Sequence, residues 1–185
     1  MEGRIFSINI SAEKNATKTM VVSGRLREGQ GLDGDAHAGP GLRQISLLAI
    51  EQIEDFETRK GIEDLPPGSF GENITTEGFD LSSLRVGDKI RIGATALLRI
   101  TQKGKDCHGS CVIRQKTGDC LMPKAGVFAV VETGGDIQVR DPLWLVNSRT
   151  QIFSLISRMF AAKQPQKKYL FRDGVIPFTE KDPHD

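Results

Sequence analysis

The chain contains 185 residues, of which 38% are hydrophobic and 26% are charged, and its formal net charge is +1. These values are typical of a soluble globular protein with one domain, or with one domain and an appendage. They exclude a strong overall field that would attract nucleic acid or an anionic membrane, so neither is expected as a partner. No secretory signal and no apolar run of about 18 residues is seen, which predicts a cytoplasmic protein.

The first half of the chain contains the patterns of three strands and one helix. Alternating residues over 5–10 and an apolar group at 19–22 predict strands, and a long glycine-rich loop follows them. A continuous apolar run over 43–50 predicts a buried strand. Apolar residues at helical spacing predict a helix near 49–60, and Gly61 lies where a glycine that ends a helix is expected.

The second half contains short apolar segments separated by glycine. Two strands are predicted at 89–92 and 96–101, with Gly93 at the bend between them. The segments 127–131 and 136–139 predict a hairpin, because a glycine-containing turn joins them. Several short strands with glycine turns and few helices indicate a mostly-β protein, either a barrel or a sandwich.

The C-terminal residues differ in pattern from the rest of the chain. We predict one domain over residues 1–145, followed by a C-terminal helix and tail over residues 146–185 that is docked on the barrel or partly disordered. The predicted helix carries its apolar residues on one face, and these are Ile152, Phe153, Ile156, Met159 and Phe160. Packing against the rest of the domain is the simplest role for such a face.

All the cysteines of the chain lie between residues 107 and 120, and their odd number argues against a disulfide framework. Cys107, Cys111 and Cys120, together with His108, could supply the ligands of a structural zinc ion. However, the second closely spaced pair of a zinc knuckle is missing, and an iron–sulfur cluster needs about four protein ligands. The remaining alternatives are a reactive or ligating thiolate, and thiols that pack as small apolar groups.

Four stretches, taken in order, resemble the MOSC domain, a family named for the C-terminal domain of molybdenum cofactor sulfurases. They are Gly31–Glu54, Pro67–Gly93, the cysteine stretch that ends in AGVFAVV, and Gly134–Leu143. The resemblance implies a bent antiparallel β-barrel with a few helices, in agreement with the strand pattern. It also implies a function, because members of the family carry sulfur or bind the molybdenum cofactor through a cysteine thiolate, and some relatives reduce N-hydroxylated compounds.

By this resemblance, Cys107 occupies the position of the family's characteristic cysteine, and it is the predicted catalytic thiolate and molybdenum ligand. The family commonly has proline before this cysteine, whereas this chain has Asp106. A neighbouring carboxylate disfavours a thiolate, but the nearby Lys103, Lys105 and His108, or a bound metal, would offset that effect. Cys111 and Cys120 are then accessory thiols, either resolving thiols for a persulfide or buried structural groups.

The glycine-rich loop offers groups that suit the phosphate and the pterin of such a cofactor. Glycine permits close approach of the main chain at Gly34, and main-chain N–H groups of such a loop can bind an anion. Asp35 and His37 lie two residues apart, and Arg43 carries a planar fork suited to phosphate. The alternative for Asp35 and His37 is a structural role, in which they hydrogen-bond within the loop.

Asn73 and Lys124 complete the predicted cofactor pocket. The Asn73 side chain has donors and an acceptor that can read a pterin edge, although asparagine also caps turns. Lys124 can neutralise a phosphate as a point charge, or it can be a solvated turn lysine.

The predicted function is therefore a molybdenum-cofactor-binding or sulfur-carrying protein, with molybdopterin as the cofactor. The sequence leaves open whether the protein is an enzyme, either an oxidoreductase or a sulfur transferase, or a carrier. A molybdoenzyme, a biosynthetic protein or an electron-transfer protein is the expected partner, since no haem, flavin or iron–sulfur motif is seen in the sequence. The competing hypothesis is a non-catalytic adaptor or a zinc-stabilised structural domain in the metabolism of this cofactor.

Overall fold

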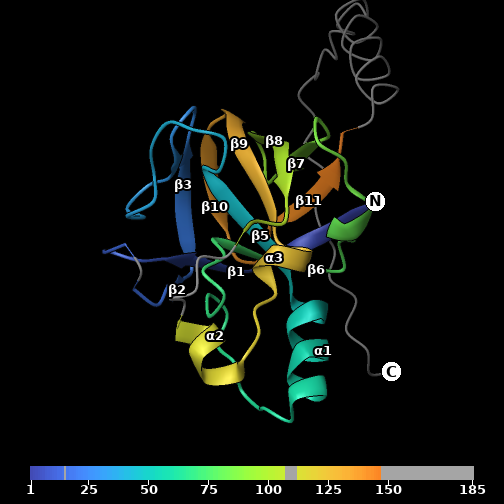
Figure 1. Cartoon of the computed structure of the whole chain (residues 1–185). Coiled ribbons are helices and arrows are strands. Elements are labelled where there is room, and N and C mark those ends of the chain that lie inside the picture. Colours follow the sequence, from blue (N-terminus) through green and yellow to red (C-terminus); the bar gives the residue numbers. More distant parts are fainter. Residues whose placement is uncertain (15, 107–111, 147–185) are drawn as a thin grey trace, which may run out of the picture. The chain divides into compact units, whose positions relative to one another are not determined.

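A closed barrel of seven strands is the central element of the fold (Figure 1). The computed structural model describes residues 1–14, 16–106 and 112–146. Around the barrel the strands follow the order β11, β7, β8, β9, β5, β6 and β1, and a β1–β11 pairing closes it. Their bounds are β1 (Glu2–Ile10), β5 (Ile45–Ala49), β6 (Ile74–Glu77), β7 (Lys89–Ile92), β8 (Ala96–Lys103), β9 (Val127–Thr133) and β11 (Pro142–Leu145). The predicted mostly-β barrel is confirmed.

Alternation of side chains along the strands fills the barrel with apolar groups. In β8, Ala96, Leu98 and Ile100 are fully buried, whereas the residues between them are only partly buried. Because successive side chains of a strand point to opposite faces, one face of each strand supplies the core. Full burial of each large aliphatic side chain contributes about 1.5–3 kcal/mol. The core therefore accounts for the closure of the barrel.

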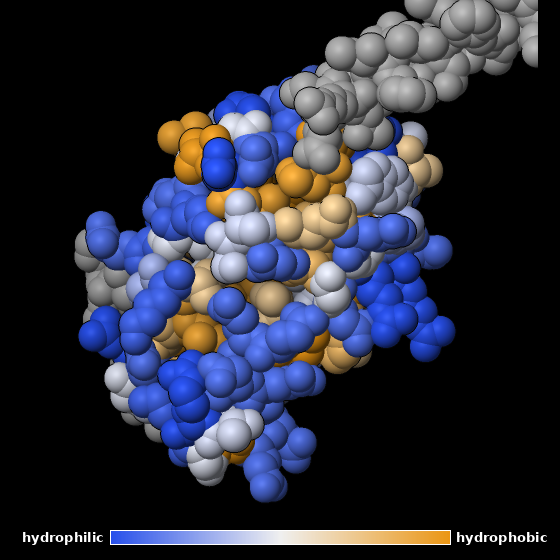
Figure 2. Space-filling model, turned by 90° about the vertical axis from the view of Figure 1, so that its right-hand side faces the viewer, coloured by the Kyte–Doolittle hydropathy of each residue, from blue (hydrophilic) through white to orange (hydrophobic). Residues whose placement is uncertain are grey.

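The helix α1 (Ile50–Lys60) connects β5 to β6, the one parallel pair among the described barrel strands. Ile53 and Phe56 face inward, and the Phe56 ring meets the ring of Phe70 edge-on, with 5.2 Å between the centroids. Gly61 ends the helix in the left-handed conformation, at φ 61°. The predicted helix and its terminating glycine are confirmed. The outward face of α1 is charged. Figure 2 shows the right-hand side of the view in Figure 1, and hydrophilic residues cover most of its lower part.

A separate sheet of three strands lies beside the barrel, in the order β10, β3 and β4. It corrects the sequence prediction of a hairpin between 127–131 and 136–139, because β10 (Gly135–Gln138) pairs with β3 (Ser23–Arg27) and not with β9. The physical reason is that both edges of β9 are already bonded, to β8 and to β5. The predicted glycine-rich loop also contains structure, namely β3 and β4 (Gly31–Leu32). The predicted strand at 19–22 is confirmed as β2 (Thr19–Val21).

A second apolar cluster lies outside the barrel and joins α1 to short helical segments. The segments are α2 (Val112–Thr117) and α3 (Met122–Ala125), and Ile113 and Met122 belong to the cluster. The short helix η1 (Leu81–Ser83) contributes Leu81 to the barrel core instead. In Figure 1, α1 and α2 lie below the barrel strands. Among the described residues, no helix has the length and apolar character needed to cross a membrane. The predicted helix around 152–160, and Cys107, His108 and Cys111, lie outside the described residues.

Candidate functional site

A layer of buried polar side chains lies on the outer wall of the barrel, over β1, β5 and β6. On these strands Asn9, Ser46 and Thr75 alternate with apolar residues of the barrel core. Thr75 Oγ1 accepts hydrogen bonds from Ser7 Oγ at 2.9 Å and from Asn9 Nδ2 at 3.2 Å. Buried polar groups are usually bonded in this way, because burial without a partner is unfavourable.

Lys18 and Asp35 form a buried ion pair. Their side chains are only 3% and 2% exposed, and the Lys18 ammonium contacts Asp35 Oδ2. Asp35 also accepts the N–H groups of Ser11, at 3.1 Å, and His37, at 2.9 Å. Burial acts to raise the pKa of Asp35, but the hydrogen bonds from Lys18, His37 and Ser11 outweigh it, so the pKa lies below its ordinary value. Asp35 is therefore an ionised carboxylate that ties three chain segments together.

Lys18 is surrounded by charges from neighbouring loops. Burial lowers the pKa of Lys18; Asp35 and Glu72 oppose this, and the positive charge of Lys105 adds to it. Glu72 is fully buried and accepts the N–H of Gly68 at 2.6 Å; burial raises the pKa of its carboxyl group. The segment that follows β8 therefore contributes, through Lys105, to the electrostatic surroundings of Lys18.

The structure brings Asp35 and His37 together, as the structural alternative in the sequence analysis anticipated. His37 Nδ1 lies 3.3 Å from Asp35 Oδ1, and the His37 side chain is 45% exposed. The negative oxygen favours a proton on Nδ1, which leaves Nε2, at the other side of the ring, as the atom available to a ligand. His37 therefore combines an inner nitrogen close to Asp35 with an accessible ring.

The other predicted cofactor-binding residues have different surroundings. Arg43 lies over the ring of Phe128, with 5.9 Å between its guanidinium carbon and the ring centroid. Asn73 is buried, and its Oδ1 accepts the N–H and the hydroxyl of Ser46 at 3.2 and 2.9 Å. Lys124 is 74% exposed, and its ammonium lies 3.5 Å from Asp119. The amide of Asn73 is thus used inside the protein, whereas Arg43 and Lys124 lie at the surface.

Cys120 is the one cysteine among the described residues, and it is 4% exposed. It belongs to the second apolar cluster, together with Leu48, Phe56 and Met122. Its N–H donates to Asp119 Oδ1 at 2.8 Å. The position corresponds to the structural alternative that the sequence analysis gave for this thiol.

Gly104, three residues before Cys107, fixes where the segment after β8 leaves the barrel. Its φ is +66°, its N–H donates to the Gly126 carbonyl at 2.7 Å, and an added Cβ would overlap the Pro123 carbonyl oxygen. We expect Gly104→Ala to lower the free energy of unfolding by about 2 kcal/mol or more, from left-handed strain and this overlap. The measurement is urea denaturation.

Gly29→Ala is the matched control for this substitution. Gly29 has a φ of +67°, but nothing lies within 4 Å of an added Cβ there. Its loss of stability should therefore reflect the backbone strain alone and be the smaller of the two. Equal losses for the two variants would show that the contact with Pro123 does not constrain the loop.

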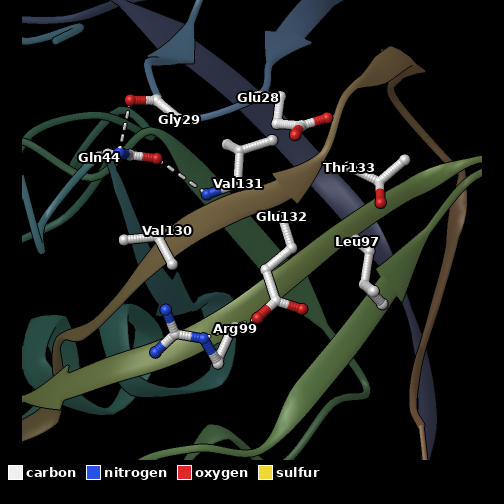
Figure 3. A pocket seen from close by; sticks show the side chains of 9 residues that line it. All are labelled: Glu28, Gly29, Gln44, Leu97, Arg99, Val130, Val131, Glu132 and Thr133. Carbon is white, nitrogen blue, oxygen red and sulfur yellow. Dashed lines mark hydrogen bonds and ion pairs between the residues drawn. The ribbon is translucent and has the colours of Figure 1, made fainter. Parts of the chain in front are cut away.

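A separate open pocket of about 590 Å³ lies against β8 and β9. Figure 3 shows Gln44 bridging its rim, where Nε2 donates to the Gly29 carbonyl at 2.7 Å and Oε1 accepts the Val131 N–H at 2.9 Å. Glu132 in the pocket is paired with Arg99 at 2.7 Å. The pocket contains none of the residues predicted to bind a cofactor, and its Glu132 carboxylate is already paired with Arg99 and Lys89. The buried polar layer is therefore the stronger candidate site.

Comparison with known proteins gives a family and a set of similar folds. A family model described as the MOSC domain matches residues 33–144, which is more than half of the chain. The solved structure of YuaD from Bacillus subtilis is 20% identical, with a TM-score of 0.65, and the match covers 78% of this chain and 96% of that one. YiiM from Geobacillus stearothermophilus is 24% identical, with a TM-score of 0.61 and coverages of 78% and 75%.

YiiM from Escherichia coli is 25% identical to the chain, with a TM-score of 0.57, and the match covers 80% of this chain and 70% of that one. No curated protein matches the chain significantly. The structural matches support the barrel fold described above.

Proposed function

Because the chain belongs to the MOSC domain family, we propose that it binds the molybdenum cofactor, or carries sulfur, through the thiolate of Cys107. The observation that carries this proposal is the match of the MOSC family model to residues 33–144, a range that includes Cys107 and, two residues before it, the cation Lys105. A thiolate next to cationic groups is stabilised. The charges around the start of this segment therefore favour a reactive or metal-binding thiol.

The described residues suit a phosphorylated pterin in two respects, which are the room at Gly34 and the buried polar atoms that lack a partner. At Gly34 the φ is +79° and an added Cβ would meet nothing within 4 Å, so the loop has room for a ligand at its main chain. Among the described residues, the buried atoms Asn9 Oδ1 and Ser11 Oγ have no hydrogen-bond partner. Ser11 is bonded through its N–H to Asp35 of the ion pair. Acceptors left over beside a charged pair match the N–H groups of a pterin edge.

We assign the parts of the pocket as follows. Arg43 and Lys124 would neutralise the phosphate, His37 would face the pterin with the buried Asp35 behind it, and Cys107 would be the protein's ligand to molybdenum. Asn73 would hold the wall of the pocket through its bonds to Ser46. When bound, the cofactor would supply two-electron redox chemistry at its metal.

The same residues serve the two activities that we consider, which are sulfur transfer and reduction of N-hydroxylated compounds. For the reduction, electrons would come from a separate electron-transfer protein or molybdoenzyme. The burial of Cys120 in an apolar cluster supports Cys107 as the working thiol, because apolar surroundings disfavour a thiolate. Cys120 would then stabilise the fold next to the site.

Elemental analysis tests the proposal. The protein is purified from a host that makes molybdopterin, and we expect molybdenum, together with the fluorescence of an oxidised pterin. Zinc in stoichiometric amount, in a fold that is lost with a chelator, would support a zinc-stabilised adaptor and contradict the proposal. A persulfide on Cys107 in protein that contains no molybdenum would show that the protein carries sulfur and does not bind the cofactor.

A further inference from the structure

The carboxylate of Asp35 lies between two groups of opposite character. Its Oδ2 contacts the Lys18 ammonium, and its Oδ1 lies 3.3 Å from the ring nitrogen Nδ1 of His37. The Lys18 and Asp35 side chains are almost fully buried, whereas the His37 ring is half exposed. The three groups therefore form a chain of contacts that runs from the buried ammonium of Lys18 to the accessible ring of His37.

A carboxylate alone at this distance would attract a second proton to the imidazole. Opposite charges within about 4–6 Å favour the charged form of a group by roughly one to three pKa units. In this structure the ammonium of Lys18 neutralises the carboxylate from its other side, and water does not screen that charge. The imidazole consequently meets a neutral pair with a fixed dipole, and not a bare anion.

We propose that Lys18 is a positioning residue, which acts through Asp35 to present His37 with its proton on Nδ1 and with Nε2 as a hydrogen-bond acceptor. The group that Nε2 would receive is an N–H or O–H of the bound ligand. His37 would therefore accept a hydrogen bond from the ligand, whereas Arg43 and Lys124 would bind the phosphate. The identity of the ligand rests on the proposed function, whereas the contacts among Lys18, Asp35 and His37 do not.

Two further charged groups face the ion pair from neighbouring loops. Glu72, from the segment before β6, adds attraction for the Lys18 ammonium, and Lys105, from the segment after β8, adds repulsion. Their opposite signs partly cancel at Lys18. Asp35 is the group in direct contact with both Lys18 and His37, so the coupling between these two residues runs through its carboxylate.

The buried ion pair has a purely structural alternative. A lysine buried with an acid could serve only to pin the segment before β2 to the glycine-rich loop, in which case its charge would not influence His37. The two roles differ in one observable, which is the titration of the His37 ring when the positive charge is removed.

The experiment is an NMR titration of His37 in the protein without cofactor. We expect Lys18→Met to move the midpoint of the His37 titration to higher pH by about one unit or more, a tenfold change in proton affinity, because Asp35 is no longer neutralised. Lys14→Met removes an exposed lysine from the same loop and should leave the midpoint unchanged. An unchanged midpoint in folded Lys18→Met would overturn the proposal.

A second measurement needs no variant, and it decides the matter if Lys18→Met fails to fold. Nitrogen chemical shifts of the wild-type His37 ring at neutral pH should show a proton on Nδ1 and none on Nε2. A proton on Nε2 would contradict the assignment of this nitrogen as an acceptor. Both measurements are made without cofactor, so a failure to find molybdenum would leave their outcome standing.

Discussion

Asp35→Ala is expected to lower the free energy of unfolding by about 3–5 kcal/mol, the cost of breaking a buried ion pair from one side. The substitution leaves the Lys18 ammonium, with 3% exposure, without its carboxylate. It also removes the acceptor of the Ser11 and His37 N–H groups. Urea denaturation at pH 7 measures the loss.

Asp33→Ala is the matched control in the same loop. Asp33 is 45% exposed and pairs with Arg27 at 2.8 Å, so water screens the pair and its loss should cost much less stability than the loss of Asp35. The double variant Lys18→Met, Asp35→Leu should regain much of the stability that Asp35→Ala loses, because it leaves no charge unpaired. Equal losses for Asp35→Ala and Asp33→Ala would show that the buried pair does not organise the site.

The difference in stability between wild type and Asp35→Ala should depend on pH, because the pKa of Asp35 is lowered in the folded protein. A carboxyl group whose pKa is lower in the folded state stabilises the protein above its unfolded pKa of about 3.9, and that contribution is lost as the pH falls through the folded value. The gap in stability between wild type and Asp35→Ala should therefore narrow in acid. The effect of pH through Glu72 is the opposite, because burial raises the pKa of its carboxyl group. Its contribution to stability is present at low pH and is lost as the pH rises through the pKa of Glu72 in the folded protein.

Local patterns predicted the elements whose stability is local. The helix α1 carries its apolar residues at helical spacing and ends at a glycine, and both signals are contained within about a dozen residues. β7 (Lys89–Ile92) was likewise predicted from its own sequence. The pairing of β10 with β3 joins residues more than a hundred positions apart, and no local signal distinguishes it from a hairpin.

The candidate site was predicted in part, for the same physical reason. Asp35 and His37 are brought together by two-residue spacing in one loop, so the sequence could indicate their contact. Lys18 was missed, since nothing in its neighbourhood separates it from the exposed Lys14 in the same loop. Its burial arises only when the loop before β2 folds over the glycine-rich loop, which is a tertiary event.

The family resemblance supplied what neither spacing nor composition could, namely the ranking of Cys107 above the other cysteines. The structure adds the buried position of Cys120 and the charges near Lys105.

Cys107→Ser is expected to have the largest effect on function, with at least a tenfold loss of bound molybdenum. A serine hydroxyl is a poor ligand for a soft metal and is not deprotonated as readily as a thiol. Cys120→Ser is the control within the same stretch. It buries a hydroxyl group in the second apolar cluster, so it should lower the free energy of unfolding by about 1–3 kcal/mol while molybdenum is kept in the folded fraction.

The molybdenum-to-protein ratio of wild type, Cys107→Ser and Cys120→Ser, purified side by side from a host that makes molybdopterin, tests the central claim most directly. We predict a ratio near one in wild type and in folded Cys120→Ser, and almost no molybdenum in folded Cys107→Ser. Molybdenum that survives Cys107→Ser, or wild-type protein that contains zinc and no molybdenum, would contradict the assignment of Cys107 as the ligand of the cofactor.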